Sequence, residues 1–202
     1  MIRYRHRLKG GYVISDLKNE IIQTALILFE KYGFHGVSVN KIVDEVGTSK
    51  GGFYHYFSSK DEVLYLIHDE FITYALQKAD EGFRKHKSPT KKLRDIINNF
   101  VKVFDLYQAH ITVFYQEQIY LPEHYETMIK QKRDQFRDII IKTIQLGVES
   151  GEFRKELHPV ITGMAILGMV NWIYRWYRKD GEKSIEEIAQ YYEDMIIYAV
   201  LK

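Results

Sequence analysis

Residues 38–64 constrain the fold of this chain more than any other stretch, because they read as two short helices joined by a tight turn and followed by a third. Apolar residues with helical spacing run from Val39 to Val46 and stop at Gly47. Glycine supplies the permissive backbone that a short connection between two helices requires. The stretch therefore predicts a helix-turn-helix.

Cap residues indicate where these helices begin. Ser38 can cap the first short helix, and Thr48 or Ser49 can cap the second. The run Ser59-Lys60-Asp61-Glu62 has the capping-box pattern and predicts the start of the following helix.

The second short helix has a surface suited to DNA. Gly51 and Gly52 make its first turn small, so that its backbone can approach the major groove closely. Basic and aromatic side chains that can reach phosphates and base edges complete this surface, namely Lys50, Tyr54, His55 and Tyr56.

This region resembles the DNA-binding domain of TetR/AcrR-type transcriptional repressors. The matching residues lie between Lys18 and Leu64 and are Ala25, Phe29, Tyr32-Gly33-Phe34, Ser38-Val39, Ile42, Gly47, Gly52-Phe53-Tyr54, Tyr56-Phe57, Lys60 and Leu64. The chain departs from the usual pattern at three positions. Thr48 replaces a common valine, Gly52 replaces threonine or serine, and Phe53 replaces leucine. Of these changes, Gly52 removes a hydroxyl that often contacts phosphate.

The resemblance implies specific DNA contacts. Tyr54 matches the tyrosine that faces DNA, although a partly buried ring is the alternative. Asn40 matches a base-reading position and can pair with adenine. Lys60 can share a phosphate with free amides at its helix start, unless it is simply solvated. The predicted DNA-contacting set is Ser38, Asn40, Lys41, Thr48, Ser49, Lys50, Gly51, Tyr54, His55, Tyr56 and Lys60.

Composition sets broader limits. The chain has 202 residues, of which 46% are hydrophobic, and this suits a globular protein of one or two domains. No apolar run reaches the roughly 18–20 residues of a membrane-spanning helix. Cysteine is absent, which suits a cytoplasmic protein. The net charge of +2 is too small to indicate DNA binding by itself. Residues 1–15 are basic and form either a solvated tail or an arm that contacts DNA.

The rest of the chain predicts an all-α fold of about nine helices. Prolines at 89, 122 and 159 each fit the first position of a helix. The expected helices span 16–31, 60–85, 88 to about 107, 110–120, 122–150 and 159 to about 180, with a last one from Ser184 onward. We expect residues 16–62 to form the helix-turn-helix domain and 63–202 to form an effector-binding and dimerisation domain.

The last two expected helices of the chain predict self-association. The segment from Val160 to Ile173 is apolar nearly all round, so two of its faces must be covered. A second copy of the last two helices would complete a four-helix bundle. The resemblance also implies a homodimer, while a central helix in a monomer is the alternative.

No sequence motif indicates catalysis. The chain lacks GxSxG, P-loop, GxGxxG and HExxH patterns, and its histidines are scattered. Acidic pairs such as Asp134 and Asp138 are typical of solvated helix faces. We therefore predict no enzyme activity, catalytic residue, metal or cofactor.

A second resemblance concerns the effector. The run from Asn171 to Gly181, followed by Ser184 and Ile188, looks like a subgroup that controls lipid, steroid and aromatic-acid catabolism. Several members respond to acyl-CoA thioesters, although the motif can equally mark dimerisation. The effector set is Arg84, Phe100, Phe104, Tyr107, Phe114, Tyr115, Gln118, Arg133, Phe136, Arg137, Ile140, Met164, Gly168 and Trp172.

This mostly apolar set suits a long hydrophobic ligand, with arginines for its charged end. Aromatic residues at helical spacing can also be plain core. The favoured reading is a repressor of fatty acid genes that acyl-CoA releases from double-stranded DNA. The alternatives are a repressor that senses a drug-like or aromatic hydrophobe, and a helical lipid carrier or enzyme without DNA binding.

Overall fold

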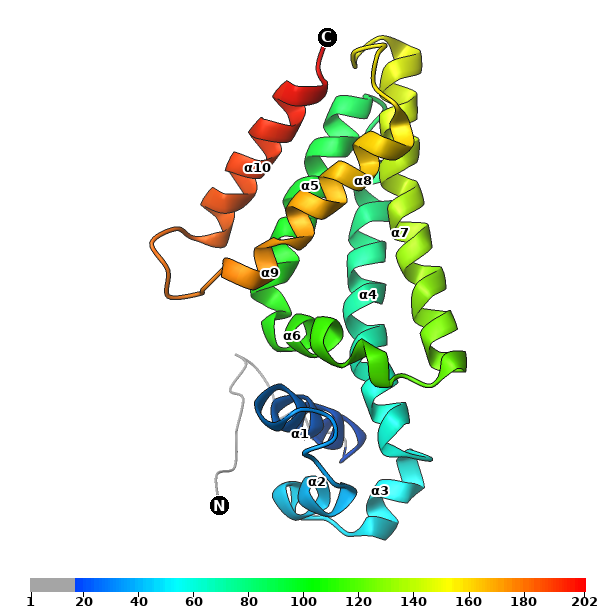
Figure 1. Ribbon diagram of the computed structural model, residues 1–202, viewed down its shortest axis with the longest axis vertical. Helices are drawn as coiled ribbons and strands as arrows, with labels where there is room; N and C mark the ends of the chain where they lie inside the picture. Colours follow the sequence, from blue (N-terminus) through cyan, green and yellow to red (C-terminus); the bar gives the residue numbers. More distant parts are fainter. Residues whose placement is uncertain (1–16) are drawn as a thin grey trace.

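The computed structural model describes residues 17–202, and helices make up most of this range (Figure 1). The predicted all-α fold is confirmed, and the basic arm at 1–15 lies outside the described residues. The helices are α1 (Leu17–Tyr32), α2 (Val39–Val46), α3 (Lys50–Tyr56), α4 (Lys60–Lys85), α5 (Pro89–Leu106), α6 (Gln108–Glu117), the 3-10 turn η1 (Gln118–Tyr120), α7 (Glu123–Ser150), α8 (Pro159–Asn171), α9 (Ile173–Trp176) and α10 (Ile185–Val200).

Helices α1, α2 and α3 form a small unit at one end, and α4 runs from that unit into the rest of the molecule (Figure 1). There α4 packs between α5 and α7, and α10 packs along α5. Helix α6 lies across the end that faces α1 and contacts it. Helix α8 packs on α7 and crosses in front of α5. The small unit is therefore connected to the rest of the molecule by α4 and by the contact between α1 and α6.

The predicted caps position the helix-turn-helix. Ser38 Oγ accepts a hydrogen bond from the Lys41 amide at 3.2 Å, and Ser49 Oγ accepts one from the Gly52 amide at 3.1 Å. Gly47 has φ = 80°, in the left-handed region where glycine costs least. The turn between α2 and α3 is thus fixed by two serine caps and one glycine.

The starts of α4 and α10 differ in how completely they form a capping box. At α10, Ser184 and Glu187 make both reciprocal bonds of the motif. At α4, Ser59 Oγ accepts from the Glu62 amide at 3.2 Å, but the Glu62 carboxylate accepts from the Ser58 amide and hydroxyl instead. The box at α4 is therefore half formed, although the helix begins where predicted.

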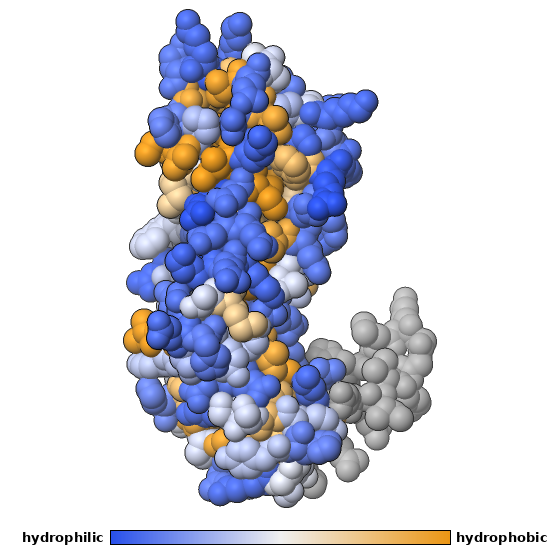
Figure 2. All heavy atoms as spheres, turned by 90° about the vertical axis from the view of Figure 1, so that its right-hand side faces the viewer, coloured by the Kyte–Doolittle hydropathy of each residue, from blue (hydrophilic) through white to orange (hydrophobic). Residues whose placement is uncertain are grey.

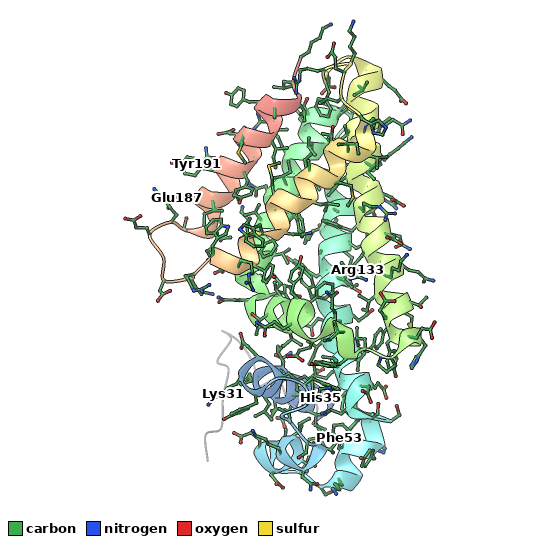
Figure 3. The ribbon with its side chains drawn as sticks, in the orientation of Figure 1. Lys31, His35, Phe53, Arg133, Glu187 and Tyr191 are labelled. Carbon is green, nitrogen blue, oxygen red and sulfur yellow. The ribbon has the colours of Figure 1, made fainter. Side chains whose placement is uncertain are left out.

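Buried apolar side chains hold the small unit together. Phe29, Ile42, Phe53 and Phe57 are each at most 1% exposed and come from three helices and the turn after α3. Phe53, labelled in Figure 3, packs against Phe57 with ring centroids 5.3 Å apart. Burying one such ring contributes about 1.5–3 kcal/mol. This core fixes which side of α3 faces outward.

The predicted helix from Pro159 to about Asp180 is wrong in its second half. It ends at Asn171, and the short α9 stops at Trp176. Tyr177 is buried, and its hydroxyl donates to Asp105 Oδ1 on α5 at 2.7 Å. Because this contact requires the chain to leave the helix, tertiary packing overrides the local helical pattern.

Smaller differences occur at α6 and α7. Helix α6 begins at Gln108 and gives way to 3-10 turn at Gln118, and Pro122 is the residue before α7. Met128 on α7 is 44% exposed. Figure 2, in which the side of the molecule that carries α7 faces the viewer, shows a mainly hydrophilic surface. None of the helices within 17–202 combines the length and apolar content needed to cross a bilayer.

Candidate nucleic-acid interface and effector core

The exposed face of α3 carries the predicted DNA-reading residues. Tyr54 is 55% exposed, and its ring stands edge-on against buried Phe53 at a centroid distance of 5.3 Å. Lys50, Gly51 and His55 are exposed beside it. Tyr56 is half-buried and contacts the rings of His55 and Phe57. The core of the small unit therefore directs Tyr54 outward, as expected from sequence.

The start of α2 adds a second group of exposed residues. Ser38 and Asn40 are exposed, and Lys41 is half-buried. The Lys41 ammonium lies 3.3 Å from the centroid of the Tyr32 ring, in a cation–π contact. Lys41 is thus held at the surface by α1, and its charge is placed at the edge of the helix-turn-helix.

Thr48 and Gly52, two of the departures from the usual family pattern, are in fact linked. A Cβ atom on Gly52 would lie 2.5 Å from Thr48 Oγ1, closer than van der Waals contact allows. Since Thr48 is half-buried, a side chain at position 52 would have to move it. The sequence reveals both departures, but their steric connection appears only in the structure.

The Lys60 ammonium makes contacts within the protein that its sequence position did not indicate. Its Nζ donates hydrogen bonds of 2.7 Å to the carbonyls of Phe34 and Val37, and it lies 4.0 Å from the Phe34 ring centroid. Desolvation lowers the Lys60 pKa, while the carboxylates of Asp61 and Glu117 oppose that shift. The ammonium therefore ties the start of α4 to the loop between α1 and α2.

Replacing Lys60 by methionine should thus weaken folding rather than remove a phosphate contact. We expect the free energy of unfolding to fall by about 1–3 kcal/mol, since two carbonyls lose a charged donor. The slope of log affinity against log salt should stay at the wild-type value. Exposed Lys50→Ala is the control, and should lower that slope by about 0.9. Denaturant titration and salt-dependent DNA binding measure both effects; a slope change in Lys60→Met would restore the phosphate role.

In the larger domain, part of the predicted effector set forms one aromatic core. Phe100 packs against Phe136 with ring centroids 4.6 Å apart and against Phe104 at 5.7 Å. Ile140 is buried one helical turn from Phe136. Tyr115 stacks on Tyr174 of α9 at 4.2 Å. These contacts bring α5, α6, α7 and α9 together, as an effector site between them requires.

A polar edge borders this core where α6 meets α7. Arg133 donates to Gln118 Oε1 and to Glu126 Oε1, both at 3.0 Å. Its guanidinium carbon lies 6.0 Å from the Phe114 ring centroid. Figure 3 labels Arg133 on α7 above α6. The predicted residues Phe114, Gln118 and Arg133 are therefore neighbours, with Tyr107 close to the same end through its contact with Phe71.

Four members of the predicted effector set lie away from the core. Met164, Gly168 and Trp172 are exposed, because α8 buries its opposite face through Gly163, Ile166 and Val170. Helix α8 is apolar all round, so its sequence does not indicate which face is buried. Arg84 pairs with Asp80 near the far end of α4, and its side chain is 77% exposed.

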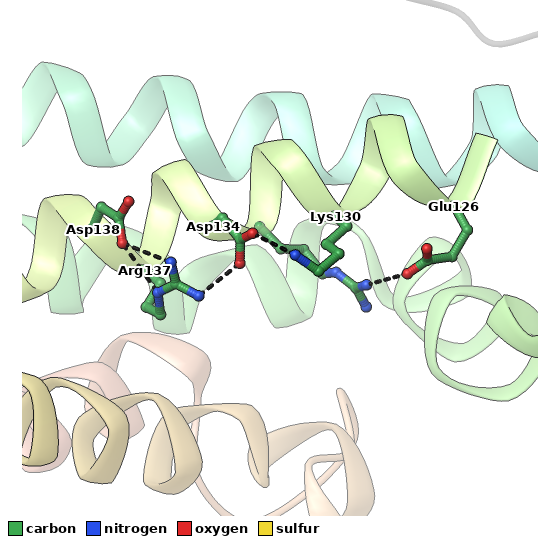
Figure 4. A network of polar contacts seen from close by, with 6 residues as sticks. Glu126, Lys130, Asp134, Arg137 and Asp138 are labelled. Atoms are coloured by element: carbon green, nitrogen blue, oxygen red, sulfur yellow. Dashed lines mark hydrogen bonds and ion pairs between the residues drawn. The ribbon is translucent and has the colours of Figure 1, made fainter. Parts of the chain in front are cut away.

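Arg137 is occupied by neighbours on its own helix. Its guanidinium bonds Asp134 at 2.7 Å and Asp138 at 2.9 Å, and Lys130 pairs with Asp134 (Figure 4). A ligand phosphate would have to displace these carboxylates. Arg133 is the better placed of the two arginines for a charged group at the edge of the core.

The hollows in the surface do not coincide with the predicted pocket. One of about 450 Å³ lies between α4, α5 and the start of α10, and its walls include ion-paired Lys78, Glu81, Lys85 and Asp95. A smaller one of about 60 Å³ borders the aromatic core and is lined by Phe104, Gln108, Ile111, Thr112, Tyr174, Tyr177 and Arg178.

Buried polar residues between α4 and α6 were missed by sequence reasoning. His68 is fully buried, and His110 and Glu117 are less than 9% exposed. His110 Nε2 lies 3.4 Å from Glu70 Oε2. No motif marks them, because a single polar residue on a helix is unremarkable until its burial is known. In the part of the chain described, no cluster of side chains is arranged to hold a metal.

Comparison with known proteins identifies this arrangement. Residues 21–65 match "Bacterial regulatory proteins, tetR family", and residues 86–200 match "Tetracyclin repressor-like, C-terminal domain". The HTH-type transcriptional repressor KstR2 of Mycolicibacterium smegmatis (strain ATCC 700084 / mc(2)155) is 25% identical over 189 residues, covering 91% of this chain and 90% of the relative.

Solved structures agree. The TetR family regulator PfmR from Thermus thermophilus is 29% identical with a TM-score of 0.83, covering 88% of this chain and 97% of that one. AibR, solved in complex with isovaleryl coenzyme A and operator DNA, shares the fold at 21% identity and a TM-score of 0.79, covering 89% and 97%. With its amino-terminal helix-turn-helix and its matched carboxyl-terminal domain, the chain belongs to the TetR family of DNA-binding transcriptional repressors, which are not enzymes.

Proposed function

We propose that this chain is a homodimeric repressor of lipid-metabolism genes that an acyl-CoA thioester releases from its operator. The observation that carries the proposal is the aromatic core between α5, α6 and α7 with Arg133 at its edge. An acyl chain suits the aromatic side chains, and a phosphate or carbonyl suits a guanidinium. The fold shared with AibR, whose structure contains isovaleryl coenzyme A and operator DNA, supports the same ligand class.

The effector domain is proposed to start within the first turn of α4, at residue 63, with the DNA-binding unit spanning 16–62. Support comes from α4 itself, which is one unbroken helix from Lys60 to Lys85. A continuous helix carries motion at its far end to its start. Glu117 of α6 also lies near Gly33 of the small unit, at 3.5 Å from where a Cβ would sit. The continuous helix α4 and the proximity of Glu117 to Gly33 each connect the aromatic core to the small unit that holds α3.

Dimerisation is proposed through α8 and α10. The stretch from α8 through α9 and the helix α10 expose large apolar side chains, which are Val160, Ile161, Met164, Met169, Trp172, Trp176, Tyr191, Met195 and Tyr198. Figure 3 shows Tyr191 pointing away from the molecule on α10. Monomeric proteins rarely expose large apolar patches, so this number of exposed apolar side chains favours a partner surface. A second copy would cover it and set the distance between two α3 helices, which must match half-sites about 34–36 Å apart.

Effector binding would then act by population shift. A ligand that fits the core better when α6 and α4 have moved favours that arrangement. The two α3 helices would then no longer match the half-site spacing, and affinity for DNA would fall.

We expect acyl-CoA affinity to rise with chain length. Each buried methylene should add about 0.8 kcal/mol until the core is full. On operator-bound protein, octanoyl-, dodecanoyl- and palmitoyl-CoA should release DNA at progressively lower concentrations, whereas acetyl-CoA and free CoA should not. Dodecanoate should act more weakly than its CoA ester, because it lacks the CoA phosphates and amides, which add contacts at the polar edge around Arg133. Fluorescence anisotropy of labelled operator measures release.

Two outcomes would contradict this proposal. An affinity independent of chain length, or a dodecanoate as effective as its ester, would favour an aromatic or drug-like effector. The stacked Tyr115 and Tyr174 rings, 4.2 Å apart, provide flat surfaces for such a ligand. Native mass spectrometry of the purified protein would identify that alternative directly. Failure to shift any DNA selected from random sequence would instead favour a helical carrier.

A further inference from the structure

His68 is a buried polar residue inside the effector domain. It is on α4, is 0% exposed, and its ring lies 5.1 Å from the Phe114 ring on α6. Phe71, one turn along α4, packs on the same Phe114 ring at 5.0 Å. The imidazole of His68 is thus enclosed by aromatic side chains. A phenylalanine at this position would suit the same apolar surroundings.

The hydrogen bond of His68 fixes which nitrogen carries the proton. Nδ1 lies 2.9 Å from the carbonyl oxygen of Leu64. A carbonyl can only accept, so Nδ1 is the donor. Burial lowers the pKa of His68 to about 4, against the opposing influence of the carbonyls of Leu64 and Phe114. The ring is therefore neutral near pH 7, and Nε2 carries a lone pair.

Nε2 has no hydrogen-bond partner among the described residues. The Phe114 carbonyl, which also lies near the ring, is itself an acceptor. Arg133 influences His68 electrostatically, but its hydrogen bonds go to Gln118 and Glu126 rather than to His68. A buried acceptor left unpaired costs about 1–3 kcal/mol. His68 Nε2 is thus a buried acceptor beside a carbonyl that cannot donate to it, and only a hydrogen-bond donor would satisfy it.

We propose that His68 Nε2 accepts a hydrogen bond from a hydroxyl on the acyl chain of the effector, so that the protein selects hydroxylated acyl thioesters. This rests on the proposed function and specifies its ligand. The amides and phosphates of CoA belong at the polar edge around Arg133. His68 lies among Phe71 and Phe114, where only the acyl part of such a ligand suits the surroundings. A plain acyl chain there would leave the acceptor unpaired.

Paired ligands test this directly. Binding of dodecanoyl-CoA, 3-hydroxydodecanoyl-CoA and 12-hydroxydodecanoyl-CoA to the DNA-free protein would be measured by calorimetry. In the wild type, one hydroxylated ester should bind at least about ten-fold more tightly than dodecanoyl-CoA, as a site built to bond a hydroxyl discriminates against its absence. In His68→Phe this preference should disappear, while dodecanoyl-CoA binds as well as before or better.

Stability separates recognition from folding. His68→Phe should unfold at the same or higher denaturant concentration than wild type, since it removes an unpaired acceptor and keeps an aromatic ring. His110→Phe is the matched control: His110 is also buried on the α4–α6 boundary and its Nε2 also lacks a hydrogen bond, but that nitrogen faces the Glu70 carboxylate at 3.4 Å. It should keep the hydroxyl preference.

The outcomes are distinguishable. Equal affinities of the wild type for all three esters would overturn the role of His68 and leave acyl-CoA sensing intact. A preference that persists in His68→Phe would also overturn it. Absence of binding by every ester would remove both the inference and the proposed function.

Discussion

Replacing Tyr54 by alanine is expected to reduce operator affinity at least 100-fold while leaving the fold intact. The ring is 55% exposed on α3, and only its edge contacts Phe53. Aromatic anchors at the centre of interfaces commonly contribute 2 kcal/mol or more when truncated. The loss of stability should stay within about 1–2 kcal/mol, because little buried surface is removed. Anisotropy with an operator selected from random DNA, together with thermal unfolding, measures both quantities.

Phe53→Ala provides the opposite control one residue away. Phe53 is 0% exposed and packs on Phe57, so its truncation should cost about 3–5 kcal/mol of stability. The two variants therefore separate DNA contact from folding on a single helix turn. If Tyr54→Ala unfolded as readily as Phe53→Ala, Tyr54 would belong to the core and another face of α3 would meet DNA.

Met195→Glu is expected to convert the dimer to a monomer and to reduce operator affinity by roughly 100-fold or more. Met195 is 50% exposed on α10, in the interface that we propose. A carboxylate buried there without a partner would cost several kcal/mol, and twice in a symmetric interface. A monomer binds one half-site alone and loses the roughly 10²–10⁴-fold gain that linkage of two sites provides. The measured mass should fall from twice 24.1 kDa to 24.1 kDa.

Met128→Glu is a matched control for this experiment. Met128 is 44% exposed on α7, outside the face formed by α8 and α10. It should leave both the mass by sedimentation and the DNA affinity unchanged. A dimer that survives Met195→Glu but is broken by Met128→Glu would move the interface to α7.

Local sequence signals predicted much of the secondary structure. Helix α4 was predicted at its observed bounds, because Ser59 caps its start and unbroken apolar spacing continues to its end. Gly47 and Gly151 were predicted as helix ends, and both have the positive φ that favours glycine. Tyr54 was predicted to be exposed, since Phe53 and Phe57 occupy the buried side of the turn. These features depend on neighbours in sequence, so a single chain reveals them.

Features that depend on contacts between distant residues were not predictable. The burial of Tyr177 against Asp105, 72 positions away, ended a helix that the local pattern continued. The position of Lys60 depended on carbonyls at Phe34 and Val37 in another element. Neither contact leaves a periodic signal, because each pairs residues through space.

The sequence by itself determined the helical class, the helix-turn-helix and the presence of an apolar face beyond what one copy needs. Tertiary structure decided which face of the uniformly apolar α8 is exposed, which arginine borders the aromatic core, and that His68 is enclosed without a partner for Nε2 among the described residues. The physical reason is that periodicity and capping are local properties of the chain. Burial and hydrogen-bond satisfaction are set only when helices from different parts of the chain pack together.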